Sequence, residues 1–285
     1  MTSEITIALL PDRGVVAVSG SDARKLLQGL LTNDVAGLET SPAIHAGLLS
    51  PQGKILFDFL VVKATDGVLL DVSRAHASDL VKRLTLYKMR ADVTIRDVSN
   101  DHAVLAAFGA GARLDTGIAY PDPRFAELGW RAIVRTGEIP SAAAPETAYH
   151  AHRIALGVPE GGRDFVFGDT FPHEALFDQL HGVSFTKGCY VGQEVVSRME
   201  HRGTARKRVV PVIADVALEQ GTPVKAGEIE IGTVGSVCGP RGLALLRLDR
   251  AGEAEAKSLA LTAGGIPVRI ELPAWARFPA AAPHS

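Results

Sequence analysis

Cysteine is scarce in this chain of 285 residues, which contains only Cys189 and Cys238. No C-x-x-C pair and no Cys/His quartet occurs, so we predict neither a disulfide framework nor a metal site. Two unpaired thiols are typical of a protein from a reducing compartment. The N-terminal segment also lacks the basic residues of a secretory signal. We therefore expect a cytoplasmic protein.

Long apolar runs and phosphate-binding glycine motifs are missing as well. No apolar stretch approaches the roughly 20 residues that span a membrane. Neither G-x-G-x-x-G nor G-x-x-x-x-G-K-[ST] occurs, so dinucleotide and nucleoside triphosphate binding lack support. The formal net charge of −2 excludes strong global attraction to nucleic acid or to an anionic membrane. We expect a monomer with no membrane or direct nucleic-acid partner.

The order of predicted elements indicates an α+β fold. Apolar spacing predicts helices at 23–31, 76–89, 145–156 and 191–200. Alternating or apolar runs between turn residues predict strands at 4–10, 14–19, 45–49, 54–64, 68–72, 91–97, 102–108 and 130–135. Residues 109–129, rich in Gly and Pro, are expected to be loops. After residue 208 short strands dominate, at 208–213, 222–225, 229–238, 241–249 and 267–272, with one helical segment at 253–260. We predict a mixed α/β body over 1–203, of two packed subdomains around a cavity, and a small C-terminal β-barrel over 204–285.

Chemically active side chains are concentrated between residues 185 and 203, which read FTKGCYVGQEVVSRMEHRG. Two glycines bracket the central cysteine and tyrosine, so the backbone can turn tightly there. Lys187 and the start of the predicted helix would both stabilise a thiolate at Cys189. Alternatively, Cys189 is a small buried hydrophobic residue, the common fate of an intracellular cysteine. We predict that Cys189 is exposed and reactive, whereas Cys238, in a strand-like run, is inert.

The run Lys187-Gly188-Cys189-Tyr190-Val191-Gly192-Gln193-Glu194 resembles the K-G-C-Y-x-G-Q-E signature of the YgfZ-type folate-binding proteins. That family consists of iron–sulfur cluster assembly factors related in fold to the aminomethyltransferase (T-protein) of the glycine cleavage system. Similar runs are LLQGLLTNDV at 26–35, PQGK at 51–54, RIALGVPEGG at 153–162 and FPHEALFD at 171–178. The resemblance implies an aminomethyltransferase-like body that binds tetrahydrofolate or a one-carbon derivative of it.

The signature also nominates site residues. By this resemblance Cys189 and Lys187 are the candidates for the chemical step. Tyr190, Gln193 and Glu194 are candidate folate contacts because they belong to the same run.

Three residues outside the signature are further candidates for folate binding. Asp58 interrupts an apolar strand. Its carboxylate either faces solvent or is buried for a functional reason, since burying a carboxylate without a partner is costly. The aminomethyltransferase relatives have an aspartate in a comparable strand, near the reactive end of the folate. Tyr149 either stacks on a pterin or benzoyl ring or is a half-buried helix aromatic. Arg198 either binds the carboxylates of the folate tail or lies on a solvated face.

Three classes of function compete. The resemblance favours a tetrahydrofolate-binding accessory factor for assembly or repair of iron–sulfur clusters, with client enzymes (tRNA-modifying enzymes among them) or assembly proteins as partners. The alternative is a folate-dependent aminomethyltransferase, which does not need the thiol. A cysteine hydrolase requires a base within reach of the thiol, and no histidine is nominated. An RNA-binding module is not indicated either, because the basic run at 198–208 has few interleaved aromatic residues. We expect the first function.

Overall fold

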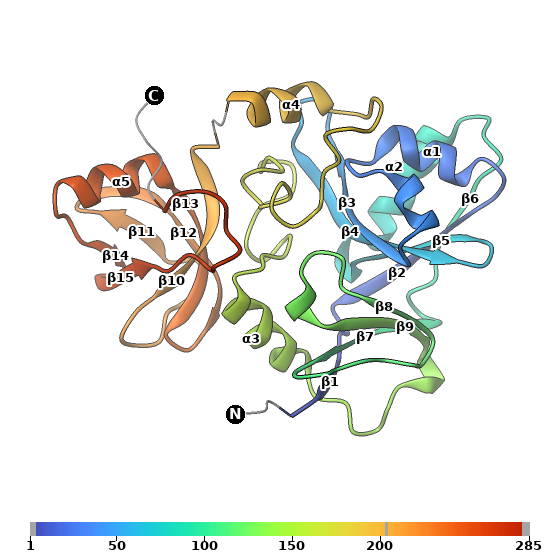
Figure 1. The fold of residues 1–285 in the computed structure, drawn as a ribbon, viewed down its shortest axis with the longest axis horizontal. Helices are drawn as coiled ribbons and strands as arrows, with labels where there is room; N and C mark the ends of the chain where they lie inside the picture. The colour runs from blue at the N-terminus through green and yellow to red at the C-terminus, as the bar shows by residue number, and fades with distance from the viewer. Residues whose placement is uncertain (1–3, 203–204, 281–285) are drawn as a thin grey trace. The chain divides into compact units, whose positions relative to one another are not determined.

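The computed structural model describes residues 4–202 and 205–280, except for the side chain of Arg202 (Figure 1). The chain divides into two compact units. The first comprises Met1–Tyr149 and Leu180–Gln193, and the second comprises His150–Gln179 and Glu194–Ser285. The domain boundary predicted between residues 203 and 204 lies outside the described residues.

Two antiparallel sheets form the first unit. One has five strands in the order β3-β4-β5-β2-β6, and the other has four in the order β1-β7-β9-β8. The strands of the five-stranded sheet are β2 (Arg13–Ser19), β3 (Ala43–Leu49), β4 (Ile55–Ala64), β5 (Gly67–Ser73) and β6 (Thr94–Asp97). Those of the four-stranded sheet are β1 (Thr6–Leu9), β7 (His102–Phe108), β8 (Ile118–Pro121) and β9 (Trp130–Arg135).

One face of the five-stranded sheet is apolar. Alternation along the strands directs every second side chain to this face, where α1 (Ala23–Leu30) and α2 (Ala77–Lys88) complete the core. Phe59 and Leu70 from the strands and Leu27 and Leu80 from the helices are fully buried there. Burying such side chains contributes about 1.5–3 kcal/mol each. This core holds α1 in a fixed position against the sheet.

The opposite face of that sheet, here called the polar face, carries buried charged side chains among apolar ones. Asp71 on β5 accepts hydrogen bonds from Arg13 Nε at 2.6 Å and from Arg131 Nη1, on β9, at 2.8 Å. Arg131 Nε also donates to Asp122 at 3.0 Å. A buried ion is tolerated only when its charge and its hydrogen-bonding groups are matched. This network therefore joins the two sheets through charge pairs.

The second unit contains a closed antiparallel barrel of six strands, in the order β10-β13-β12-β11-β14-β15. They are β10 (Lys207–Ile213), β11 (Pro223–Ala226), β12 (Ile229–Cys238), β13 (Arg241–Arg247), β14 (Leu261–Ala263) and β15 (Ile266–Ile270). Small and branched side chains such as Val210, Val234 and Ala244 fill its core. Closure leaves no open sheet edge within the barrel.

Three further helices belong to or border the second unit. They are α3 (Glu146–Leu156), α4 (Gln193–Arg202) and α5 (Leu248–Ala256). The barrel strand β10 is buried on both sides, because Val210 faces the barrel core while Val209 packs with Leu243 and with Ile154 of α3. Within the described residues, no helix combines the length and apolarity needed to cross a membrane.

The predicted α+β class with a C-terminal β-barrel is confirmed. Two short strands were not predicted. β8 lies within a stretch expected to be loop, and β14 was not expected. The last helix begins at Leu248, five residues before the predicted start. The preceding strand therefore ends at Arg247 and not at the predicted residue 249.

We predict that Asp71→Asn destabilises the protein by about 3–5 kcal/mol, because it removes the charge that balances two buried arginines. The free energy of unfolding in urea is the measurement. Burial favours the neutral form of Asp71, but Arg13 and Arg131 outweigh it and hold its pKa below the usual value. Its contribution is present above the ordinary carboxyl pKa of about 3.9 and is lost as pH falls through the lower folded value, so the difference should shrink in acid.

Asp79→Asn is the matched control. Asp79 pairs with Lys82 at 2.9 Å, but both side chains are more than half exposed, so we expect no measurable change in stability. Equal stability of Asp71→Asn and the wild type at neutral pH would contradict this account of the network.

Candidate functional site

The signature loop, residues 184–193, is fixed by a lysine rather than by apolar packing. Lys187 is 8% exposed, and its ammonium donates to the carbonyl oxygens of Gln28 at 2.7 Å, Leu31 at 2.7 Å and Asn33 at 2.9 Å. These carbonyls lie at and just after the C-terminus of α1, where backbone acceptors have no partner in the helix. A cation is also favoured there by the helix dipole. The loop is therefore tied to a helix that the apolar core holds in place.

Burial changes the acidity of that ammonium group. It lowers the pKa of Lys187 to about 8, with the carboxylate of Asp34 acting in the opposite direction. An ammonium group has three protons to donate, and the three carbonyls use all of them. The lysine thus serves as a structural clamp of the loop.

Polar side chains just after α1 add further anchors. Thr32 Oγ1 donates to the Gly182 carbonyl at 2.6 Å and accepts from the Gly47 N–H at 2.8 Å. Asn33 Nδ2 donates to the carbonyls of His45 and His181 at 2.8 and 2.7 Å. Three runs that resemble the family, 26–35, 51–54 and the signature, therefore meet in one place.

The two glycines of the signature have different surroundings. Gly192 has a positive φ of 81°, and a Cβ there would lie 2.6 Å from the Ser50 carbonyl oxygen and 3.0 Å from the Gly53 Cα. It therefore packs directly on the turn between β3 and β4 and requires glycine. A Cβ at Gly188 would meet nothing within 4 Å.

Cys189 is exposed, as predicted, while the next residue is buried. The ring of Tyr190 is 7% exposed and lies 5.2 Å from Lys187 Nζ, within the range of a cation–π contact. Burial raises the pKa of Tyr190 to about 12. The loop therefore presents a thiol to solvent on a backbone that is anchored on both sides.

The structure adds detail to two expectations about the thiols. Lys187 was expected to stabilise a thiolate at Cys189, which stays a prediction, and its donors are used by backbone carbonyls. Cys238 lies at the end of β12, as expected, yet its side chain is exposed too. Exposure alone therefore does not distinguish the two thiols. What distinguishes Cys189 is the anchored loop that carries it.

Asp58 does not face solvent. It is 9% exposed on the polar face of the five-stranded sheet, and it has no hydrogen bond to any of the described residues. On the neighbouring strand β3, His45 lies two residues from Gly47, the register partner of Asp58. Burial lowers the pKa of His45, and the charge of Asp58 opposes that change. His45 Nδ1 lies 2.9 Å from the Leu180 carbonyl, which can only accept, so Nδ1 carries the proton.

Tyr149 is fully buried rather than half-buried. It is 1% exposed, and its hydroxyl accepts hydrogen bonds from Arg124 Nη2 at 2.8 Å and Arg131 Nη2 at 2.6 Å. The guanidinium of Arg131 also lies 5.0 Å from the ring centre. Removing Tyr149 would therefore leave two buried guanidinium groups without this acceptor and destabilise the unit. The two arginines, which no sequence pattern singles out, determine its environment.

The remaining candidates lie on α4. Gln193 is the first residue of α4 and is half-buried. The backbone N–H of Gln193 donates to the Tyr190 carbonyl at 3.3 Å. Glu194 and Arg198 form an exposed pair at 3.5 Å, one helical turn apart. Exposed pairs of this kind contribute little to stability, so both side chains are available to a ligand. Their assignment to folate stays a prediction.

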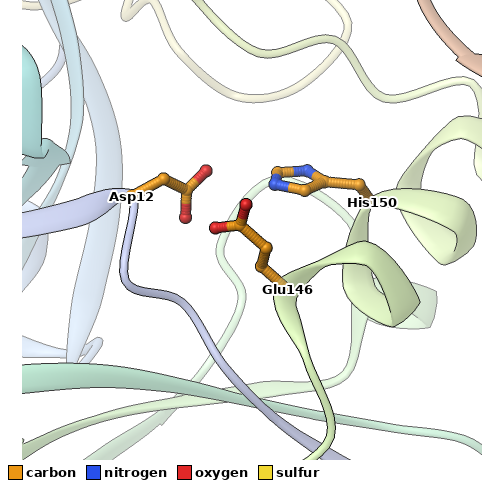
Figure 2. A group of neighbouring side chains, drawn as sticks. All are labelled: Asp12, Glu146 and His150. Atoms are coloured by element: carbon orange, nitrogen blue, oxygen red, sulfur yellow. The ribbon is translucent and has the colours of Figure 1, made fainter.

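Figure 2 shows three further polar side chains, Asp12, Glu146 and His150. Asp12 and Glu146 belong to the first unit, and His150 is the first residue of the second. Within its own unit His150 accepts a hydrogen bond from Arg153 Nε at 2.9 Å. We assign no function to this group.

Comparison with known proteins identifies two family matches. Residues 12–114 match the family described as the GCVT N-terminal domain, and residues 206–278 match the CAF17 C-terminal β-barrel domain. The structure of the glycine cleavage system aminomethyltransferase T from Bartonella henselae superimposes with a TM-score of 0.76 over 96% of this chain and 87% of that chain. At 16% identity this likeness concerns the fold alone.

Several curated proteins are similar in sequence. The mouse iron–sulfur cluster assembly factor IBA57 is 32% identical, over 84% of this chain and 76% of its own length. The human protein is 36% identical over 71% of this chain and 65% of its own length. The homologue from Mycosarcoma maydis is 38% identical over 77% of this chain. The chain spans only 59% of that fungal protein and about half to two thirds of most of these relatives.

The expectation of a cytoplasmic protein is corrected by these relatives, which are named as mitochondrial. Scarce cysteine indicates a reducing environment, but it does not distinguish one reducing compartment from another.

We predict that Lys187→Met destabilises the protein by about 2 kcal/mol, because it leaves one buried and two partly buried carbonyls without their charged donor. The free energy of unfolding is the measurement, and the exposed Lys63→Met is the control. Folded Lys187 loses its proton near pH 8, whereas the unfolded side chain keeps it to about 10.5. The unfolded chain then binds more protons, so the stability difference between wild type and variant should widen between these pH values. A constant difference would place the folded pKa at its ordinary value.

Proposed function

The chain belongs to the family of IBA57 iron–sulfur cluster assembly factors, and we propose that it is a folate-binding accessory factor for assembly or repair of iron–sulfur clusters in client enzymes. The observation that carries the proposal is the exposed thiol of Cys189 on the anchored signature loop. An enzyme client or an assembly protein is the partner that such a thiol would meet at the surface.

The chemistry of a single thiol supports a role shared with a partner. Thiolate sulfur is the ligand that iron–sulfur clusters prefer, and a cluster takes about four such ligands. Among the described residues the only other cysteine, Cys238, lies on the barrel. Cys189 would therefore supply one ligand, or one nucleophilic sulfur, while the partner supplies the rest. The backbone anchors keep the thiol in place while the partner docks.

The polar face of the five-stranded sheet supports folate binding. Asp58 is a buried carboxylate without a hydrogen bond from the described residues, and such a group is costly unless a donor reaches it. The N–H groups of a pterin are donors of the required kind. In this proposal Asp58 accepts from the pterin and the neighbouring His45, neutral because of its burial, lines the same place.

A folate-dependent aminomethyltransferase is the second candidate, and the fold favours it. The two functions differ in their need for the thiol. Aminomethyl transfer uses the folate and the residues around it, whereas the proposed assembly function requires Cys189.

We predict that Cys189→Ser lowers the activity of iron–sulfur enzymes in cells that depend on this protein, while the affinity for tetrahydrofolate stays unchanged. Serine keeps the size of the side chain but removes the soft sulfur ligand. Cys238→Ser is the matched control, since it removes the other exposed thiol and should behave as the wild type. Full iron–sulfur enzyme activity in Cys189→Ser, together with one-carbon transfer by the purified protein, would favour the aminomethyltransferase.

We further predict that Asp58→Asn weakens tetrahydrofolate binding about ten- to a hundredfold in calorimetry, because a hydrogen bond to a charged group contributes roughly 1.5–3 kcal/mol. The variant should fold, since the charge it removes has no hydrogen bond from the described residues. Glu39→Gln, an exposed carboxylate of the same unit, is the control. Unchanged affinity in Asp58→Asn would remove this residue from the folate site.

A further inference from the structure

One imidazole and two carboxylates converge in the second unit, outside the signature loop. His173, Asp178 and Glu200 place one ligand atom each within 4.8 Å of one another. His173 and Asp178 belong to the run FPHEALFD, whose resemblance to the family has no role in the proposed function, and Glu200 lies on α4. We propose that these three side chains bind one divalent transition-metal ion.

Arg208 holds two of the three ligands in place. Its guanidinium donates to Asp178 Oδ1 and Oδ2, both at 2.9 Å, and its Nη1 also donates to the His173 carbonyl at 2.9 Å. The side chains of His173 and Asp178 are only 3% and 7% exposed. Hydrogen bonds of this kind orient metal ligands in advance. A carboxylate oxygen has a second lone pair, so Asp178 Oδ1 can still reach an ion.

Glu200 is the ligand that can move. Its side chain is 44% exposed, and Oε2 lies 3.0 Å from His173 Nε2. With bonds of about 2.1 Å, two neighbouring ligands of an octahedral ion are about 3.0 Å apart and opposite ligands about 4.2 Å apart. The imidazole and the carboxylate are therefore already at the spacing of neighbouring ligands. All three ligand atoms lie within 4.8 Å of one another, close to the largest spacing in such a set.

The charge of the cluster suits a cation. Asp178 and Glu200 are both negative, and Arg208 balances only one of them, so one negative charge remains beside the neutral form of His173. An ion would take the place of the hydrogen bond between His173 Nε2 and Glu200 Oε2. Three protein ligands leave positions open for water or for an incoming ligand.

The donor set selects the class of metal. Imidazole with carboxylates suits ferrous, manganous or zinc ions, whereas copper(I) and preformed iron–sulfur clusters prefer thiolates. We assign ferrous ion as the natural occupant, because a cluster assembly factor works where iron is supplied. Only this choice of metal rests on the proposed function. The ion site itself rests on the geometry.

The test is a metal titration of the full chain after chelation. Ferrous ion is added without oxygen in one series, and cobalt(II), whose visible absorption reports its ligands, in another. We expect one ion per chain, and at least about tenfold weaker binding in Glu200→Gln and His173→Gln. Glu200 is the primary position, since its exposure makes the variant tolerable to the fold. His201→Gln, exposed on the same helix, is the control and should bind as the wild type.

Two results would overturn the site: equal affinity in Glu200→Gln and the wild type, or no binding by the wild type at millimolar metal. Binding of cobalt without ferrous ion would support the site and overturn the assigned occupant. Cys189→Ser keeps all three ligands and should still bind the ion. The cellular assay of that variant tests the proposed function separately, so either proposal can fail without the other.

Discussion

The signature loop depends on one buried ammonium group. Lys187 donates to three carbonyls at the end of α1, and each of these acceptors would otherwise be left without a partner where water is excluded. The interaction stabilises both α1 and the signature loop. It supplies donors to the carbonyls at the C-terminus of the helix, and it fixes the backbone two residues before the thiol. Apolar contacts alone would not set the direction of the loop, since they are non-directional.

A second constraint is the buried charge between the two sheets of the first unit. Arg13, Arg124 and Arg131 face Asp71 and Asp122, so the arginines outnumber the aspartates by one. Asp58 adds a third carboxylate on the same polar face. This arrangement places polar groups on a face that is shielded from solvent. A ligand with both polar and apolar parts, such as a pterin, requires a site of this kind. The stability of the unit and the polarity of its inner face therefore have the same source.

Local patterns predicted most of the fold. The strands predicted at 54–64 and 68–72 are found as the paired strands β4 and β5, and α1 begins at the predicted residue. Short elements such as β8 were missed because their strand character comes from pairing with β9, not from their own sequence. The last helix was misplaced because Leu248 and Ala251, which pack on the barrel, follow an apolar strand without a turn residue.

The site was predicted only in part, and for a similar reason. The signature identified Cys189 directly, but the partners of Lys187 lie more than 150 residues away in the chain. The same holds for Tyr149, whose two arginines come from a region read as loop and strand. His173 and Glu200 are 27 residues apart, a separation that no metal-binding pattern describes. Long-range hydrogen bonds, not local propensity, decide the roles of these side chains.

The two glycines beside the thiol differ in their evolutionary freedom. Gly192 is confined by the Ser50 carbonyl and a left-handed backbone, so almost any mutation there would displace the loop and be eliminated by selection. Gly188 faces open space in an ordinary conformation, and larger residues can be accommodated. A lineage could therefore vary the bulk and polarity next to Cys189 at position 188, and adapt the thiol to a new client, while the anchor stays intact.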